Sequence, residues 1–175
     1  ALVYNENNLI VLNNYAYYLS LGNKDLNRAE KMSGKTIKAN PQSSTFLDTY
    51  AWISFKLGEY NIARLYIEQA YYYGGDKSYE STDHYGDILY KTGEPKEEYH
   101  AKWIKAWEMV QEKHPDELHK YEKLKRKAET GIYEECGHDY LSLEYYRQPL
   151  TDENRFLKAL SMYLKDECSL DFLID

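Results

Sequence analysis

The sequence predicts an all-α protein, built as a stacked array of helical hairpins. Its first support is a repeat: tyrosines occur at Tyr15, Tyr50 and Tyr85, a constant spacing of 35 residues. A small residue follows each tyrosine, namely Ala16, Ala51 and Gly86. A fixed period in this range is typical of stacked repeats, and such arrays usually work as extended binding surfaces. The second support is that each period contains two stretches with apolar residues at helical spacing, separated by glycine.

The first repeat is predicted over residues 9–41. Its first helix has an apolar face made of Leu12, Tyr15, Ala16 and Leu19, and Gly22 ends it. Its second helix has a face made of Ala29, Met32, Thr36 and Ile37. Asn40 and Pro41 stop this helix, because proline disfavours helical backbone in the residue before it.

The second and third repeats, over residues 44–75 and 79–110, follow the same plan. Leu47, Tyr50, Ala51 and Ser54 line one helix, and Gly58 ends it. The partner helix runs from about Tyr60 to Tyr73, and its predicted face comprises Ile62, Ala63, Tyr66, Ile67 and Ala70. The third repeat has Tyr85, Gly86, Ile88 and Leu89, then Gly93, and a second helix with Trp103, Ala106 and Trp107.

This pattern resembles the tetratricopeptide repeat (TPR). The resemblance covers roughly residues 1–110, and the residues that carry it best are Leu47, Tyr50, Ala51, Gly58, Tyr60, Ala63 and Ala70. The third repeat departs from the pattern, since Glu98 replaces a small residue. The start of the chain resembles the tail of an earlier repeat, so we expect the sequence to begin inside an array. The overall pattern is similar to the C-terminal part of bacterial TPR proteins, many of which act at the cell envelope; the compartment stays open between envelope and cytoplasm.

The resemblance implies a concave groove lined by the first helix of each pair. On the helix face opposite the packing residues, the predicted groove residues are Asn13, Tyr17, Ser20, Asp48, Trp52, Phe55, Asp83, Asp87 and Tyr90. Aromatic side chains beside carboxylates suit a peptide with apolar and basic side chains. The same acidic residues would repel a partner's C-terminal carboxylate, so the TPR subtype that grips such carboxylates is rejected. In the competing interpretation, Tyr17, Trp52 and Phe55 are buried core residues.

After the repeats, residues 111–136 are predicted to form a C-terminal capping helix. Pro115 opens it, Gly131 ends it, and its apolar face contains Leu118, Tyr121, Leu124 and Ala128. The basic run from Lys120 to Lys127 is interleaved with Glu122 and Leu124, which is typical of a solvated helix face. Residues 137–175 are predicted to be helical and to pack on the array.

Composition narrows the classes of partner. The net charge of −7 argues against a nucleic-acid partner, because phosphate contacts need clustered Lys and Arg. No stretch approaches the roughly 20 apolar residues that a membrane helix needs. Two cysteines, Cys136 and Cys168, make no disulfide framework and could pair or stay free. The chain does not begin with methionine, so we expect a trimmed piece of a longer protein.

The sequence offers weak candidates for catalysis or for binding a metal. His114 and His119 are five residues apart and do not share a helix face, and Cys136 with His138 supplies only two ligands. A cysteine–histidine pair would also need an orienting group and an oxyanion pocket. Asp83 and His84 sit in a predicted helix, where a surface histidine is the simpler interpretation. We therefore predict no enzyme activity, no cofactor and no metal.

The sequence thus predicts a non-catalytic interaction module that binds a peptide or partner protein. Trp52 would be its aromatic anchor, so Trp52→Ala should leave the fold intact and weaken binding; a sharp fall in melting temperature would instead identify Trp52 as core. The alternative is a structural or oligomerisation module whose groove is filled by its own C-terminal segment or by a second copy, giving a homodimer. An accessory domain of a larger enzyme is a third possibility.

Overall fold

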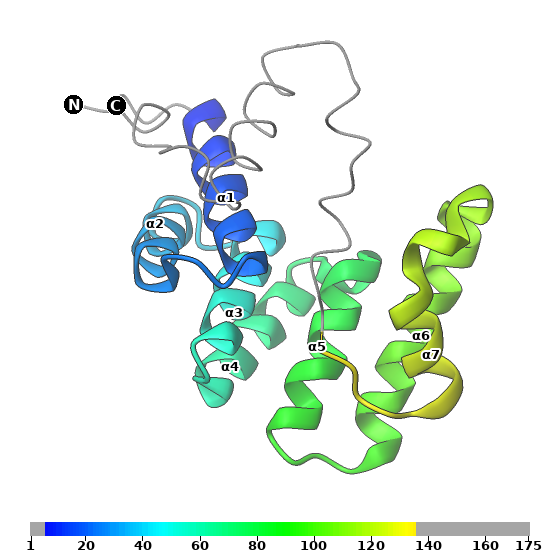
Figure 1. Ribbon diagram of the computed structural model, residues 1–175. Coiled ribbons are helices and arrows are strands. Elements are labelled where there is room, and N and C mark those ends of the chain that lie inside the picture. Colours follow the sequence, from blue (N-terminus) through cyan, green and yellow to red (C-terminus); the bar gives the residue numbers. More distant parts are fainter. Residues whose placement is uncertain (1–5, 136–175) are drawn as a thin grey trace.

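The computed structural model describes residues 6–135, and every regular element in that part of the chain is a helix (Figure 1). The elements are α1 (Glu6–Leu21), α2 (Leu26–Ala39), α3 (Ser44–Lys56), α4 (Tyr60–Tyr72), the 3₁₀ turn η1 (Gly75–Lys77), α5 (Tyr79–Lys91), α6 (Lys96–Lys113), the 3₁₀ segment η2 (Pro115–Tyr121) and α7 (Glu122–Thr130). The all-α prediction is confirmed for these residues. The predictions made for residues 137–175, and those for Cys136, His138 and Cys168, lie outside them.

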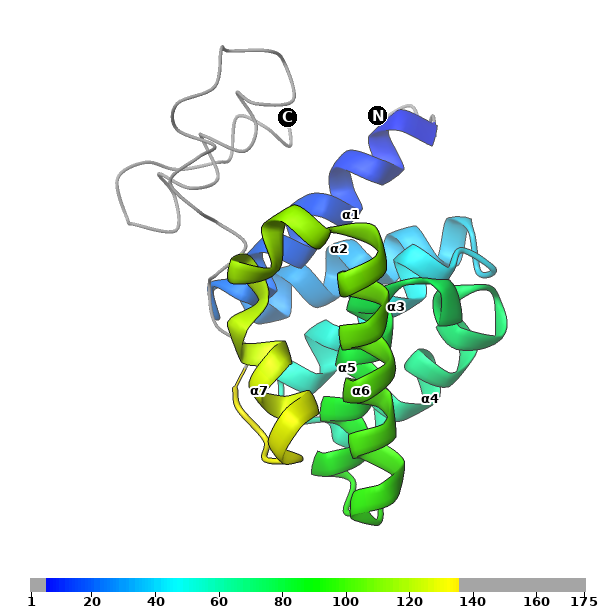
Figure 2. The ribbon, with the colours of Figure 1, turned by 90° about the vertical axis from the view of Figure 1, so that its right-hand side faces the viewer.

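The helices pack in the order in which they follow one another along the chain. Each of α1 to α6 contacts the next helix, and α7 packs on α6. Contacts also connect α1 with α3, and α3 with α5. Helices α1, α3 and α5 therefore form a row, with α2, α4 and α6 packed beside it (Figures 1 and 2).

The turns explain why the helices end where they do. Gly58 and Gly93 both have φ of 81°, a left-handed conformation that glycine adopts without steric cost, and they close α3 and α5. The hydroxyls of Ser43 and Ser78 accept hydrogen bonds from backbone N–H groups in the first turns of α3 and α5.

The turn between α1 and α2 is built differently. It is one residue longer than the turn after Gly58, and its left-handed residues are Asn23, with φ of 50°, and Asp25, with φ of 45°. Asn and Asp tolerate this conformation better than other residues that carry a Cβ. In this longer turn, the left-handed backbone conformation therefore occurs at two polar residues and not at Gly22.

The small residues of the repeat pattern are buried between helices, and the tight contact is shown at Gly86. Ala16 and Ala51 are fully buried, and a Cβ added to Gly86 would lie 2.5 Å from Cδ1 of Trp103 on α6. The predicted faces are otherwise buried or half-buried, with one exception. Ile62 is exposed on α4, because Ala63, Ile67 and Ala70 supply the buried side of that helix.

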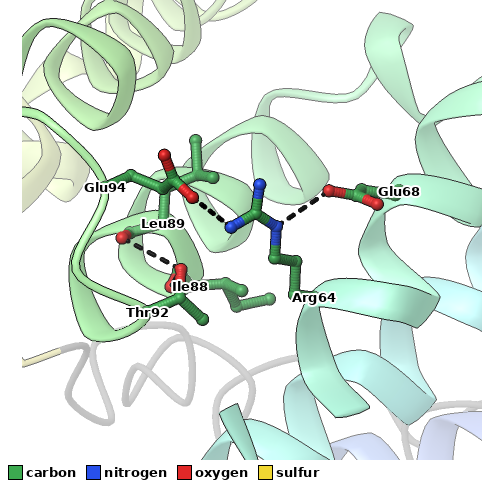
Figure 3. Close-up of polar contacts among 6 residues, drawn as sticks. All are labelled: Arg64, Glu68, Ile88, Leu89, Thr92 and Glu94. Carbon is green, nitrogen blue, oxygen red and sulfur yellow. Dashed lines mark hydrogen bonds and ion pairs between the residues drawn. The ribbon is translucent and has the colours of Figure 1, made fainter. Parts of the chain in front are cut away.

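The junction between the second and third pairs is also held by polar contacts. Arg64 on α4 reaches across to Glu94, in the turn between α5 and α6, and its Nε donates to Glu68 at 2.9 Å (Figure 3). In the same view the Thr92 hydroxyl donates to the carbonyls of Ile88 and Leu89, which caps the end of α5. The turn that follows α5 is thereby fixed to α4 as well as to α5.

The predicted continuous helix from Pro115 to Thr130 is wrong in its first half. Residues 115–121 form the 3₁₀ segment, and Glu117 leaves helical geometry with φ of −121°. This break lets α7 turn back along α6, so that Tyr121, Leu124 and Ala128 pack in one cluster with Trp103, Ala106 and Val110. The chain then ends α7 at Gly131, with φ of 65°, as predicted.

Candidate functional site: a buried charge cluster

Five charged or titratable side chains meet where α3, α5 and α7 come together. We call them the buried charge cluster: Asp48, Asp83, His84, Asp87 and Lys127. Three of them come from α5, where a spacing of four residues places Asp83 and Asp87 on one side of the helix. Asp48 reaches them from α3 and Lys127 from α7. All five side chains are buried, including Lys127, which is only 1% exposed.

Lys127 joins α7 to α5. Its ammonium donates hydrogen bonds to Oδ1 of Asp83 and, at 2.8 Å, to Oδ1 of Asp87. It also lies 5.2 Å from the ring centroid of Trp103, whose indole N–H donates to the same Asp87 oxygen at 2.9 Å. A buried ammonium needs such compensation, since desolvating an unpaired charge is costly. The second oxygen, Oδ2 of Asp87, is buried without a hydrogen-bond partner among the described residues.

His84 occupies the other half of the cluster, where it pairs with Asp48. Its Nδ1–H donates to both carboxylate oxygens of Asp48, at 3.0 and 3.2 Å. The imidazole stacks on Trp52 with ring centroids 4.0 Å apart, and Trp52 stacks on Phe55 at 4.7 Å. His84, Trp52 and Phe55 therefore form a continuous stack of planar rings that bridges α5 and α3.

The surroundings shift the pKa values of three acidic or basic groups. Burial by itself lowers the pKa of His84, but the charge and hydrogen bond of Asp48, together with the charges of Asp83 and Glu80, raise it above its usual value. Burial raises the pKa of Asp87 to about 6; Lys127 opposes this increase and Asp83 adds to it. Burial also raises the pKa of Glu80, on the same helix face.

The arrangement keeps these side chains away from solvent. Asp48 orients His84 as the acid of an acid–base dyad would. The imidazole, however, is only 3% exposed and is covered on one face by Trp52. Within residues 6–135, no three His, Cys, Asp or Glu side chains converge in a way that could hold a metal ion. The pairs of the cluster connect α5 with α3 and with α7.

The structure does not leave the predicted groove open. Of the predicted groove residues, the buried ones are Asn13, Ser20, Asp48, Trp52, Phe55, Asp83 and Asp87. Tyr17 is half-buried, and Tyr90, at 39%, is exposed. Trp52 has no exposed surface, so its expected role as a solvent-facing anchor is wrong. The competing interpretation, in which Trp52 and Phe55 are core, is the one that agrees with their burial.

The physical reason is that α5 packs on both of its sides. Its apolar residues pack against α3, α4 and α6, and its acidic side receives Lys127 from α7. Two further expectations fail for the same reason: Lys127 is not on a solvated face, and His84 is not at the surface. A signal for Lys127 was present in the sequence, because it lies three residues after Leu124 and directly before Ala128, on the apolar side of its helix.

One part of the predicted groove remains accessible, around Tyr90. Tyr133, which follows α7, stacks on Tyr90 with ring centroids 4.6 Å apart and an interplanar angle of 6°. The ammonium of Lys91 lies 4.8 Å from the Tyr133 ring and 5.9 Å from that of Tyr60. We call Tyr60, Tyr90, Lys91 and Tyr133 the Tyr90 surface.

Comparison with known proteins found no match among family models, curated proteins or solved structures. The helices of residues 6–135 include none with the length and apolarity that crossing a membrane requires. The class that the geometry defines is therefore an all-α protein of consecutively packed helices.

Proposed function

We propose that this chain is a TPR-like α-solenoid that acts as a non-catalytic protein-interaction module. The observation that carries the proposal is the row of α1, α3 and α5. Neighbours within this row contact each other, and each member also pairs with the helix that follows it in the chain, namely α2, α4 or α6. Together with the 35-residue period, this is the arrangement by which repeat proteins build an extended surface. The partner would be a peptide or protein segment.

The partner would contact the Tyr90 surface and not the buried part of the predicted groove. Tyr90 and Lys91 are exposed, and aromatic rings that keep accessible area are common anchors in protein interfaces. Trp52, Asp48 and Asp87 are already engaged within the fold. They would therefore not contact the partner.

The proposal is tested by selecting displayed peptides against the full chain and measuring the affinity of an enriched peptide for variants. Tyr90→Ala should weaken binding by about tenfold or more, the effect expected of an interface anchor. Tyr72→Ala is the matched control, because Tyr72 is 83% exposed on α4 and lies outside the Tyr90 surface. Failure to enrich any peptide, or equal losses in both variants, would count against the proposal.

A second candidate is a structural module whose inner surface is occupied by its own C-terminal part. The observation that favours it is that Lys127 and Tyr133 contact α5 residues predicted to face a ligand. In this case no peptide would be enriched, and sedimentation would report either a monomer or a homodimer. A homodimer that dissociates in the Tyr90→Ala variant would identify a second copy as the occupant of the Tyr90 surface.

A further inference from the structure

Basic residues follow one line along α2. Arg28, Lys31, Lys35 and Lys38 recur at spacings of three and four residues, so they share a face of the helix. Lys31, Lys35 and Lys38 are exposed, whereas the opposite side of α2 is buried against the core. The three lysines span about 10 Å along the helix axis, at a rise of roughly 1.5 Å per residue.

Helix α2 has no carboxylate placed to balance these three lysines. Glu30, the acidic residue of α2, is directed toward α3, where it accepts a hydrogen bond from the Tyr50 hydroxyl. Within residues 6–135, Lys31, Lys35 and Lys38 form no ion pair. Arg64, Lys120 and Arg126, by contrast, each have a carboxylate partner.

This concentration of positive charge is costly and runs against the composition of the chain. Like charges three or four residues apart on a helix repel one another and destabilise it. The whole chain carries a net charge of −7, so the row is a local exception to its acidic character. A negatively charged partner lying along α2 would relieve the repulsion.

An open hollow adjoins the N-terminal end of the row. It has a volume of about 660 Å³, and Leu26 and Leu57 supply its apolar lining. The polar residues around it are Asn23, Asp25, Asn27, Arg28 and Lys31. The last of these, Lys31, is also the first exposed lysine of the row. A bound segment that placed an apolar side chain in the hollow would therefore bring its neighbouring residues opposite the lysines.

We propose that this α2 surface, made of Lys31, Lys35, Lys38 and the hollow beside them, binds an acidic segment of a partner protein that carries an apolar residue at its end. The row is short, about two turns of helix, and matches a few consecutive carboxylates. A nucleic acid extends far beyond such a row and would meet the repulsion of an acidic chain. The leucines of the hollow suit an apolar side chain.

The α2 surface is separate from the Tyr90 surface, so each can fail without the other. The probe is a fluorescein-labelled peptide of two leucines followed by a run of glutamates, titrated with the full chain at low salt and followed by anisotropy. We expect saturable binding that weakens as salt increases. The triple variant Lys31→Gln, Lys35→Gln and Lys38→Gln should weaken it by about tenfold, as expected for the loss of three exposed charge pairs.

The matched control replaces three other exposed lysines, Lys77, Lys105 and Lys113, with Gln. Both triple variants have the same net charge, so equal weakening in the two would assign the effect to overall charge and overturn the proposal. Helicity and melting temperature are measured for both. If the α2 triple variant loses helicity, Lys35→Gln compared with Lys105→Gln makes the same test.

Three more results would overturn the proposal. One is equal binding of a peptide in which glutamine replaces every glutamate, and another is absence of binding at low salt. The third is a different occupant of the α2 surface. Labelled oligothymidylate or phosphatidylserine vesicles that bind more tightly than the acidic peptide, in a way that depends on the α2 lysines, would identify a nucleic acid or a membrane. A homodimer in sedimentation that the α2 triple variant abolishes would identify a second copy of the chain. Binding of the acidic peptide that depends on its glutamates and on the α2 lysines supports it.

Discussion

At the scale of single residues, the close approach of α5 and α6 depends on the absence of a side chain. Gly86 faces the indole of Trp103, which is fully buried and fixed by its hydrogen bond to Asp87. The ring cannot move aside without breaking that bond. A second helical glycine, Gly34 on α2, has a different environment, because an added Cβ would lie 3.9 Å from the ring of Tyr50, an ordinary contact distance.

The two glycines should therefore respond in opposite directions to the same change. We expect Gly86→Ala to lower the free energy of unfolding by about 1–3 kcal/mol through overpacking. Gly34→Ala should raise it by about 0.5–1 kcal/mol, since alanine is the better helix former and the site has room. Urea denaturation of both variants measures the difference. Stabilisation by Gly86→Ala would show that α5 and α6 are farther apart than described.

The surroundings of Trp52 also reverse the sequence-based expectation that Trp52→Ala leaves the fold intact. The ring is stacked between His84 and Phe55 and has no exposed surface. Truncating a buried tryptophan to alanine typically costs about 3–5 kcal/mol. If such a variant lost binding, the loss would therefore reflect destabilisation of the fold and not a lost contact with a partner.

At the scale of elements, the position of α7 depends on one buried ammonium. This helix has nine residues, too few for stability in isolation, so its contacts with α5 and α6 must hold it. The apolar contacts of Leu124 and Ala128 reach the α6 cluster, and among residues 6–135 it is Lys127 that supplies the ion pairs with Asp83 and Asp87. The two carboxylates depend on Lys127 in turn.

Lys127→Met should therefore be strongly destabilising, although it keeps the apolar length of the side chain. Removing one partner of a buried ion pair typically costs about 3–5 kcal/mol, because the remaining charge stays buried without compensation. Adding Asp83→Asn and Asp87→Asn to the Met variant should recover part of the loss. Chemical denaturation of the single and combined variants measures this coupling, and a lack of recovery would mean that the loss reflects packing.

At the scale of the whole molecule, the buried charge cluster makes stability depend on pH. Asp87 and His84 both have pKa values above their usual ones, so the folded chain binds more protons than the unfolded chain near neutrality. For Asp87 this contribution is complete below its ordinary pKa of 3.8 and is lost as pH rises through about 6. For His84 it is complete below 6.5 and is lost at higher pH.

The free energy of unfolding should therefore fall as pH rises from 5 to 7.5. Asp87 contributes about 1 kcal/mol of this fall, from a conversion of roughly 1.4 kcal/mol per pKa unit. Other carboxylates titrate as well, so the measurement compares wild type with Asp87→Asn, which keeps an acceptor for the Trp103 indole. Parallel pH profiles in the two proteins would show that Asp87 does not carry the effect.

Much of the fold follows from local patterns in the sequence. Most helix boundaries and the glycine turns at Gly58 and Gly93 depend on residues near one another in the chain, and the 35-residue period predicted the small residue at Gly86. Where prediction failed, the cause was not local. The non-helical backbone at Glu117 redirects α7 toward α5, and this brings Lys127 to carboxylates 40 and 44 residues earlier.

The amino-acid sequence by itself determined that residues 6–135 form helices, where most of these helices start and stop, and which side of most of them is apolar, because propensity and period act within a few residues. Only the tertiary structure decided which polar faces are buried. Asp48, Asp83 and Asp87 look like the lining of an open groove until Lys127 of α7 pairs with Asp83 and Asp87, and His84 pairs with Asp48. Whether a helix face is buried depends on which elements pack against it. A charged side chain can be buried there because another helix supplies the opposite charge.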